Sequence, residues 1–259
     1  MDPTLIIIIF LLAIIAELID ASLGMLYGTT LSPILIIMGF DPFVTVPAIL
    51  FSQGLGGLTA AIRHHKFGNA NFHFKTDDFK SFLAISVPGL IAVLIGIIIA
   101  INIPKEILKA YIAFLVILVG IVIVFKLSFK FSWKKMWFIG FLSSFNKTVS
   151  GGGFGPFVTG GQVAIGQKSK NAISITTLSE VPICLGSFLA YFATKGFSDW
   201  SFLIILTSGA LLGGVIGPTI TKNVDENKLK AAIGILVLAL GIALATNLMG
   251  WWDITGFKI

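Results

Sequence analysis

Residues 146–156 read Asn-Lys-Thr-Val-Ser-Gly-Gly-Gly-Phe-Gly-Pro, and they interrupt a chain that is otherwise mostly apolar. A bilayer has no water to satisfy free backbone groups. Irregular backbone therefore survives at membrane depth only where it lines a cavity or is buried in protein. An intramembrane lysine is under a similar constraint. This stretch, with Lys147 at its edge, is the first place to look for function.

The surrounding composition is typical of a polytopic helical membrane protein. Hydrophobic residues make up 56% of the 259 residues and charged residues 12%, whereas a soluble domain has roughly 25% charged residues. The net charge is +6, but the lysines sit in short loops between apolar segments, so no nucleic-acid partner is expected. The N-terminal segment lacks the basic region of a secretory signal, and we expect it to be retained.

Six segments have the length and hydropathy of membrane-spanning helices. Each is close to the ~20 residues that cross a bilayer as a helix. They cover about residues 43–62, 80–101, 105–126, 171–194, 200–221 and 228–248. Residues 4–38 and 136–166 are broken by glycines instead, within 20–30 and 146–156. Each of these two regions is predicted to form an inward helix, a break and a shorter helix.

The chain also repeats itself. Residues 104–121 align without a gap to residues 225–242, with eight identities in eighteen positions. At a spacing of 127 residues the breaks match too, because Gly24 meets Gly151 and Gly28 meets Gly155. We therefore expect an all-α membrane protein with two inverted repeats, each made of a re-entrant broken-helix hairpin and three transmembrane helices. The repeats are 1–126 and 136–250, joined by a cytoplasmic linker at 127–135 and followed by a short tail at 251–259.

The placement of lysine and arginine favours this inverted arrangement. If each hairpin returns to its own side, thirteen basic residues fall on one side of the membrane and four on the other. If each half crosses four times instead, the split is ten against seven. We therefore expect both termini outside. The loops 63–80, 126–135, 168–170 and 222–230 are expected in the cytoplasm.

Two inverted hairpins bring their tips together near the midplane, where broken-helix transporters place the substrate. A short helix starting after 153–155 would direct free N–H groups and its positive dipole end toward an anion there. Close helix packing is the competing explanation for other glycines, at 54–57 and 213–214. The predicted substrate site comprises Lys147, Thr148, Ser150, Gly151, Gly152, Gly153, Gly155, Thr29, Thr30, Ser52, Gln53 and Ser179.

Lys147 is the most informative single residue of this set. An ammonium in the bilayer interior costs about 3 kcal/mol or more unless it is paired or hydrated. The run 136–145 is only about 15 Å long as a helix, so Lys147 is expected near mid-depth rather than at the surface. Two roles stay open. Lys147 binds the substrate anion, or it pairs structurally with Asp20, which lies opposite it at the repeat spacing.

Three intramembrane acids are candidates for proton coupling. Glu180 is the best candidate, because it is a lone carboxyl in an apolar span; a structural hydrogen bond to a neighbouring span is the alternative. Asp20 is the second candidate. Glu17 is the third, and we expect it to face an outer vestibule. His64, His65 and His73 lie in or near a basic loop without acidic partners at metal-ligand spacing, so we expect solvated histidines and no metal or cofactor.

The whole pattern resembles the TauE/SafE sulfite exporter family of anion permeases. A first span, a Gly-rich break and a Pro-containing short helix that ends in Gly recur after about 120 residues. The matching stretches are Gly24 to Pro42 and Ser150 to Ser169, and the polar positions Thr45, Ser52, Thr176 and Ser179 follow them. The first half departs from the family, with Gly-Met-Leu-Tyr-Gly where clustered glycines are common. The resemblance implies transport of small sulfur-containing anions such as sulfite and organosulfonates, usually outward.

We therefore expect a secondary transporter of the inner cell membrane that moves a small anion, coupled to the proton gradient, by alternating access. A cation channel or metal permease stays open because of the three acids, and a net positive site would favour the anion. An intramembrane enzyme would need a nucleophile–base pair or a metal cluster, and we find no such motif in the sequence. Expected partners are the lipid bilayer and a small anionic substrate; a monomer and a homo-oligomer both fit the sequence.

Overall fold

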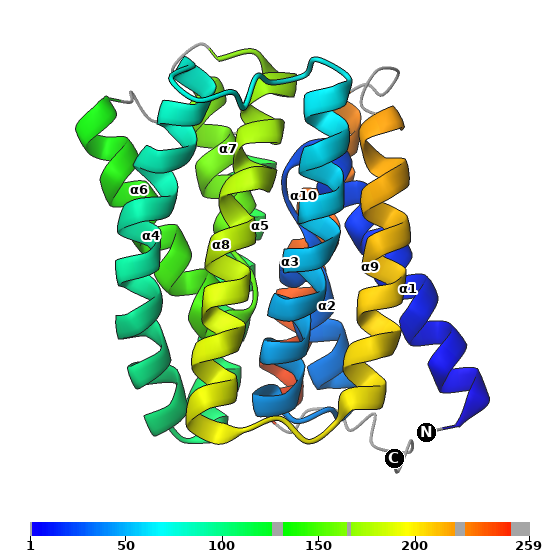
Figure 1. Cartoon of the computed structure of the whole chain (residues 1–259). Coiled ribbons are helices and arrows are strands. Elements are labelled where there is room, and N and C mark those ends of the chain that lie inside the picture. Colours follow the sequence, from blue (N-terminus) through cyan, green and yellow to red (C-terminus); the bar gives the residue numbers. More distant parts are fainter. Residues whose placement is uncertain (1, 126–131, 165–166, 221–225, 250–259) are drawn as a thin grey trace.

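The computed structural model describes residues 2–125, 132–164, 167–220 and 226–249, and these form ten helices and no strand (Figure 1). The predicted all-α fold is confirmed. The tail 251–259 and most of the linker 127–135 lie outside the described residues. The helices are α1 (Pro3–Leu23), α2 (Tyr27–Ile37), α3 (Pro42–Lys66), α4 (Asp77–Asn102), α5 (Lys105–Val124), α6 (Trp133–Ser150), α7 (Phe154–Ala164), α8 (Ser169–Lys195), α9 (Trp200–Ile220) and α10 (Glu226–Leu248).

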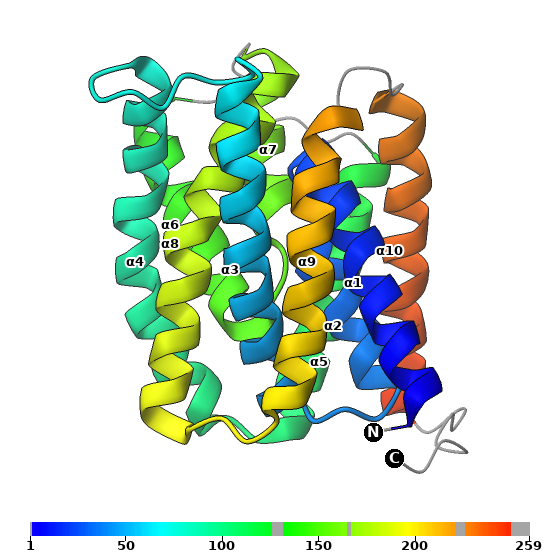
Figure 2. The same cartoon turned by 45° about the vertical axis from the view of Figure 1, so that its right-hand side comes forward.

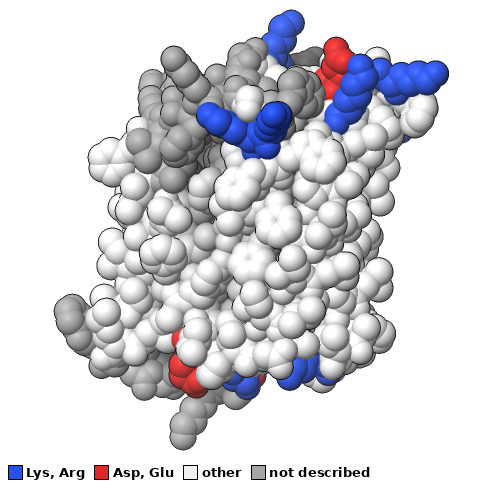
Figure 3. All heavy atoms as spheres, turned by 90° about the vertical axis from the view of Figure 1, so that its left-hand side faces the viewer, with Lys and Arg blue, Asp and Glu red and all other residues white. Residues whose placement is uncertain are grey.

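The surface of the bundle is that of a multi-pass membrane protein. Among the described residues, α1, α3, α4, α8 and α9 are long and apolar enough to cross a bilayer. Large apolar side chains such as Ile91, Leu94 and Ile98 of α4 are exposed on the outside. Figure 3 shows a broad band without charged side chains between two charged ends. Lipid rather than water suits such a band.

Both glycine breaks are made in the same way. Gly24 (φ 70°) ends α1 and Gly151 (φ 77°) ends α6 in the left-handed conformation, and their N–H groups donate to the carbonyls of Asp20 and Lys147. The helices that follow, α2 and α7, have 11 residues each. The breaks occupy 24–26 and 151–153, so they are shorter than the predicted ranges 20–30 and 146–156.

The two hairpins start from opposite ends of the bundle. In Figures 1 and 2, α1 rises from the end where α10 finishes and α2 returns to it, whereas α6 and α7 descend from and return to the other end. At the first end Lys105 forms an ion pair with Asp41, and Lys105 and Lys195 each lie 5.9 Å from the ring of Phe43. This order fits inverted repeats. The division into repeats and the orientation in the membrane stay predictions.

Each hairpin packs against a span from the other half of the chain. α1 lies on α9, and α6 lies on α4. In turn α3 packs on α9 and α8 on α4, while α3 meets α8 and α5 meets α10. This exchange places the ends of α1 and α6, with their breaks, in the interior of the bundle.

The orientation is testable with the two exposed lysines at the ends of α8, Lys168 and Lys195. In a Cys184→Ser background, Lys168→Cys should react only with a thiol reagent that reaches the cytoplasm. Lys195→Cys is the matched control, and it should react from outside, because it lies at the opposite end of the same helix. Labelling of position 168 by an impermeant reagent in intact cells would contradict the predicted orientation.

Candidate substrate site at the helix breaks

The two glycine breaks touch each other backbone to backbone. A Cβ placed on Gly28 would lie 1.6 Å from the carbonyl oxygen of Gly151. A Cβ on Gly155 would lie 2.3 Å from the carbonyl oxygen of Gly24. No side chain fits at either position. The glycines are therefore needed for the approach of the two hairpins, and the tips meet as the sequence predicted.

Hydrogen bonds across this contact satisfy the broken ends of the helices. The N–H of Gly153 donates to Thr29 Oγ1 at 3.1 Å, and Ser32 Oγ donates to the carbonyl of Ser150 at 2.9 Å. Thr159 Oγ1 donates to the carbonyl of Gly24 at 2.9 Å. Each hairpin thus supplies partners that the bilayer cannot.

The backbone donors of the second break, Gly151 to Gly153, are engaged within the protein, whereas the free N–H groups expected from the sequence belong to the first turn of α7. Gly151 N donates to the Lys147 carbonyl at 2.8 Å and Gly152 N to Ser150 Oγ at 3.1 Å. The N–H of Gly153 donates its hydrogen bond to Thr29 Oγ1. An anion that uses these groups must displace a partner within the protein.

Lys147 is buried in an ion pair with Glu180. Its Nζ lies 3.2 Å from Glu180 Oε1, and the two residues are 1% and 3% exposed. Nζ also donates to Gln53 Oε1. The amide nitrogen of Gln53 donates to Glu180 Oε2 and to Asp20 Oδ2, each at 3.2 Å. Gln53 therefore links the ammonium to both carboxylates, and four helices, α1, α3, α6 and α8, contribute to one polar cluster.

This cluster gives Lys147 a partner that the sequence analysis did not consider. Its ion pair is with Glu180, so Glu180 is not a lone carboxyl. Asp20 reaches Lys147 only through Gln53. The other oxygen of Asp20 accepts the N–H of Tyr27 at 3.0 Å, the first residue of α2. Asp20 therefore also caps the returning helix across the break.

The remaining predicted site residues are buried around the same crossing. Tyr27 Oη and Ser52 Oγ are 2.9 Å apart, and Thr148 Oγ1 and Ser187 Oγ are 2.8 Å apart. Thr30 Oγ1 turns back to the Leu26 carbonyl at 2.8 Å. Ser179 Oγ is buried without a hydrogen-bond partner among the described residues. The structure thus brings the predicted side chains together in the bundle interior.

A polar chain that the sequence did not reveal connects the crossing to α8. Gln162 Nε2 donates to Thr176 Oγ1 at 2.9 Å, and Thr159 Oγ1 lies 2.9 Å from the same oxygen. Thr159 and Gln162 are three residues apart and so share one face of α7. The three-residue spacing was the available sequence signal for this chain. Such spacing is common on helices, and only the contact with Thr176 of α8 shows that the two side chains belong to one polar chain.

The buried charges of the described residues are not net positive by formal count. One ammonium, Lys147, faces three carboxyls, those of Glu17, Asp20 and Glu180. Glu17 is fully buried, so the prediction that it faces an outer vestibule is wrong in this conformation. At least part of this negative charge must be neutralised before an anion is stable here.

His64 corrects another expectation. It is fully buried in the last turn of α3 rather than solvated. Its Nε2 lies 2.9 Å from the carbonyl oxygen of Ala21, and its Nδ1 lies 2.9 Å from the amide nitrogen of Asn69. An amide nitrogen donates, so Nδ1 accepts and Nε2 carries the proton. His64 therefore ties the inner end of α1 to the loop after α3.

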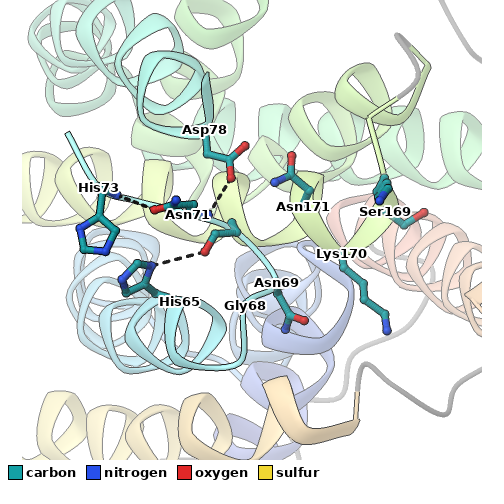
Figure 4. A pocket seen from close by; sticks show the side chains of 11 residues that line it. His65, Gly68, Asn69, Asn71, His73, Asp78, Ser169, Lys170 and Asn171 are labelled. Atoms are coloured by element: carbon teal, nitrogen blue, oxygen red, sulfur yellow. Dashed lines mark hydrogen bonds between the residues drawn. The ribbon is translucent and has the colours of Figure 1, made fainter. Parts of the chain in front are cut away.

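A polar cavity of about 1110 Å³ opens at the end of the bundle opposite Asp41 and Lys105. Figure 4 shows residues of the α3–α4 loop on one side of it and the start of α8 on the other. The α3–α4 loop contributes Asn69, Asn71 and His73, and the helix ends beside it contribute His65 of α3 and Asp78 of α4. Helix α8 and its N-cap contribute Lys168, Ser169, Lys170 and Asn171. The loop is held by the N–H of Asn71, which donates to Asp78 Oδ2 at 2.7 Å.

Comparison with known proteins agrees with this architecture. The family described as Sulfite exporter TauE/SafE matches residues 9–244. The chain belongs to this family of membrane transporters, which supports a transporter rather than an enzyme. No curated protein and no solved structure matches the chain.

The contact between the breaks predicts a strong effect of Gly28→Ala. The added methyl group would overlap the Gly151 carbonyl, and overpacking of this kind costs about 1–3 kcal/mol or more. Thermal unfolding of the purified protein should show the loss. Gly160→Ala is the matched control on α7, because nothing lies within 4 Å of its Cβ position. Equal melting temperatures for the two variants would contradict the contact.

The ion pair predicts which second substitution rescues Lys147→Ala. Removing the lysine leaves Glu180 buried without its counter-ion, which costs about 3–5 kcal/mol. Adding Glu180→Gln should recover a large part of this loss. Adding Asp20→Asn should recover less, because Asp20 keeps the donors Tyr27 N and Gln53. The free energy of unfolding measures all variants, and better rescue by Asp20→Asn would assign the ion pair to Asp20.

Proposed function

We propose that this transporter carries a small oxyanion, most simply sulfite or an organosulfonate, coupled to the proton gradient, by alternating access around the crossing of the two broken helices. The observation that carries the proposal is the buried Lys147 at the crossing, with its ammonium held by side chains rather than by solvent. Family membership supports the sulfur-containing class. We further propose an inner-membrane location with both termini outside.

The contacts of Lys147 resemble those that an oxyanion would make. The Glu180 carboxylate accepts from the ammonium and from the Gln53 amide. A sulfite or sulfonate group offers the same charge-bearing oxygens and could replace it on these donors. Ser179, one residue away on α8, has a buried hydroxyl without a partner and supplies a further donor.

Such a replacement links anion binding to a proton. An anion and the ionised Glu180 would both compete for Lys147, and two negative charges beside one ammonium are unfavourable in a low-dielectric interior. Protonation of Glu180 removes the competitor. Asp20 keeps two donors of its own throughout. The anion and a proton therefore bind together, which is the basis of coupled transport.

We propose that the anion reaches the crossing from the end of the bundle that carries Lys168 and Lys170. The polar cavity between the α3–α4 loop and the start of α8 has Lys168 and Lys170 on its wall. From the start of α8, the polar chain Gln162, Thr176 and Thr159 leads to the Gly24 carbonyl at the crossing. We assign the cavity as the inner vestibule.

One observation favours the alternative, a cation transporter. Among the described residues, three buried carboxyls outnumber one buried ammonium, and a cation would be attracted to them. The two functions differ in the effect of removing the lysine. An anion site loses its counter-ion, whereas a cation site loses a competitor.

The prediction concerns Lys147→Ala and the pH dependence of anion binding. Loss of a charge-assisted contact of roughly 1.5–3 kcal/mol should weaken sulfite binding about tenfold to a hundredfold. Wild-type affinity should rise as the pH falls, because protonation of Glu180 frees Lys147. In Glu180→Gln the affinity for an organosulfonate, whose charge does not change with pH, should be nearly independent of pH. Calorimetry on purified protein and counterflow in liposomes measure both effects.

The control variant is Lys109→Ala, on the outer part of α5 and away from the cluster, which should leave binding unchanged. Two outcomes count against the proposal. Wild-type affinity in Lys147→Ala would remove the role of this lysine. Tighter cation binding in that variant, with no anion bound by the wild type, would support the cation transporter.

A further inference from the structure

Glu17 is the buried charged group that the Lys147 cluster leaves unexplained. It is 0% exposed, in α1, one turn before Asp20. Neither carboxyl oxygen has a hydrogen-bond partner among the described residues. Asp20 has two donors and Glu180 has Lys147 and Gln53. Glu17 differs from both, because nothing in the described part of the chain compensates a charge on it by contact.

The walls around Glu17 are apolar and tight. A Cβ on Gly56 of α3 would lie 2.9 Å from Glu17 Cδ and 3.0 Å from Ala210 of α9. A Cβ on Gly213 of α9 would lie 2.7 Å from Glu17 Cβ. The carboxyl thus fills a slot between α1, α3 and α9 that is lined by glycine and alanine. Such a slot leaves no space for a metal ion with its several oxygen ligands.

The charged and titratable groups around this slot come from the neighbouring cluster. Helix α9 contains no Asp, Glu, His, Lys, Arg, Cys or Tyr, and α3 has its basic residues only in the last turn. The groups that act on Glu17 are Asp20 of α1, Tyr27 of α2, Lys147 of α6, and Glu180 and Cys184 of α8. Lys147 is already paired with Glu180. Asp20 and Glu180 repel a further negative charge.

We propose that Glu17 is a second proton-binding site, separate from the anion site, and that closure of the α1–α3–α9 seam requires Glu17 to carry a proton. The ionised carboxylate cannot stay in an apolar slot without a partner, whereas the neutral acid can. When the seam loosens and water reaches the carboxyl, the proton can leave. This inference rests on the proposed proton-coupled transport. It assigns Glu17 to the conformational step and Glu180 to the binding step.

The two roles separate in the kinetics of anion exchange. With a labelled organosulfonate in proteoliposomes, whose charge does not change with pH, the maximal exchange rate of the wild type should fall as the pH rises, about tenfold for each pH unit once Glu17 is mostly ionised. In Glu17→Gln, which is neutral at every pH, that rate should stay nearly constant. The pH dependence of organosulfonate affinity should persist in Glu17→Gln and be lost in Glu180→Gln. Glu106→Gln, an exposed acid at the start of α5, is the matched control.

A spectroscopic measurement tests the proton site without transport. Infrared spectra of purified wild-type protein in lipid should contain the carbonyl stretch of a protonated carboxylic acid. The band should lose intensity in Glu17→Gln and be unchanged in Glu106→Gln. An undiminished band in Glu17→Gln, or a wild-type pH dependence of its maximal rate, overturns the inference. Wild-type protein that has the band but exchanges no anion instead contradicts the proposed function.

Discussion

The contact between the two glycine breaks is the constraint on which the rest of the structure depends. Each break exposes carbonyl and N–H groups that the bilayer cannot satisfy, and the partners come from the opposite hairpin. Thr159 donates a hydrogen bond to the Gly24 carbonyl, and Ser32 donates one to the Ser150 carbonyl. Thr29 accepts a hydrogen bond from the Gly153 N–H. Neither hairpin has its broken end satisfied without the other. Movement of one hairpin therefore breaks hydrogen bonds of the other. The proposed alternating access requires such coupling between the two hairpins.

Much of the fold was predictable because the amino-acid composition of a segment indicates whether it spans the membrane. Spans follow from length and hydropathy, and the breaks follow from glycines that recur at the same positions of both halves, Gly24 and Gly28 against Gly151 and Gly155. The burial of Lys147 followed from its distance to the start of its helix. Close approach of the breaks followed from their equal spacing along the chain. Each of these inferences uses local sequence or a repeat, and none of them needs the direction of a side chain.

Side-chain partners could not be predicted in the same way. The repeat places Asp20 opposite Lys147, yet Asp20 is occupied by the Tyr27 N–H and by Gln53, and Glu180 takes the ion pair. His64 was misassigned because α3 continues beyond the apolar run and buries the ring against α1. The Gly153 N–H is engaged by Thr29 of the other hairpin, and the Gly152 N–H by Ser150 of its own. Each of these side chains has several possible partners nearby. Differences of a few ångströms decide which partner it contacts, and the spacing of residues along the chain does not predict such differences.

The two halves also differ at one equivalent position, and the difference gives the two breaks unequal backbone strain. Gly153 adopts φ 81° in the second break, where glycine has no Cβ to oppose it. At the repeat spacing its counterpart is Leu26, which adopts φ 121° and is 3% exposed. A positive φ in a non-glycine residue costs of order 1–3 kcal/mol and persists only where the surroundings hold it. Burial in the core holds Leu26. The first break therefore stores strain that the second does not, and Glu17 and Asp20 lie on the helix that leads into it. Loosening around α1 would release that strain at the same time as it admits water to Glu17.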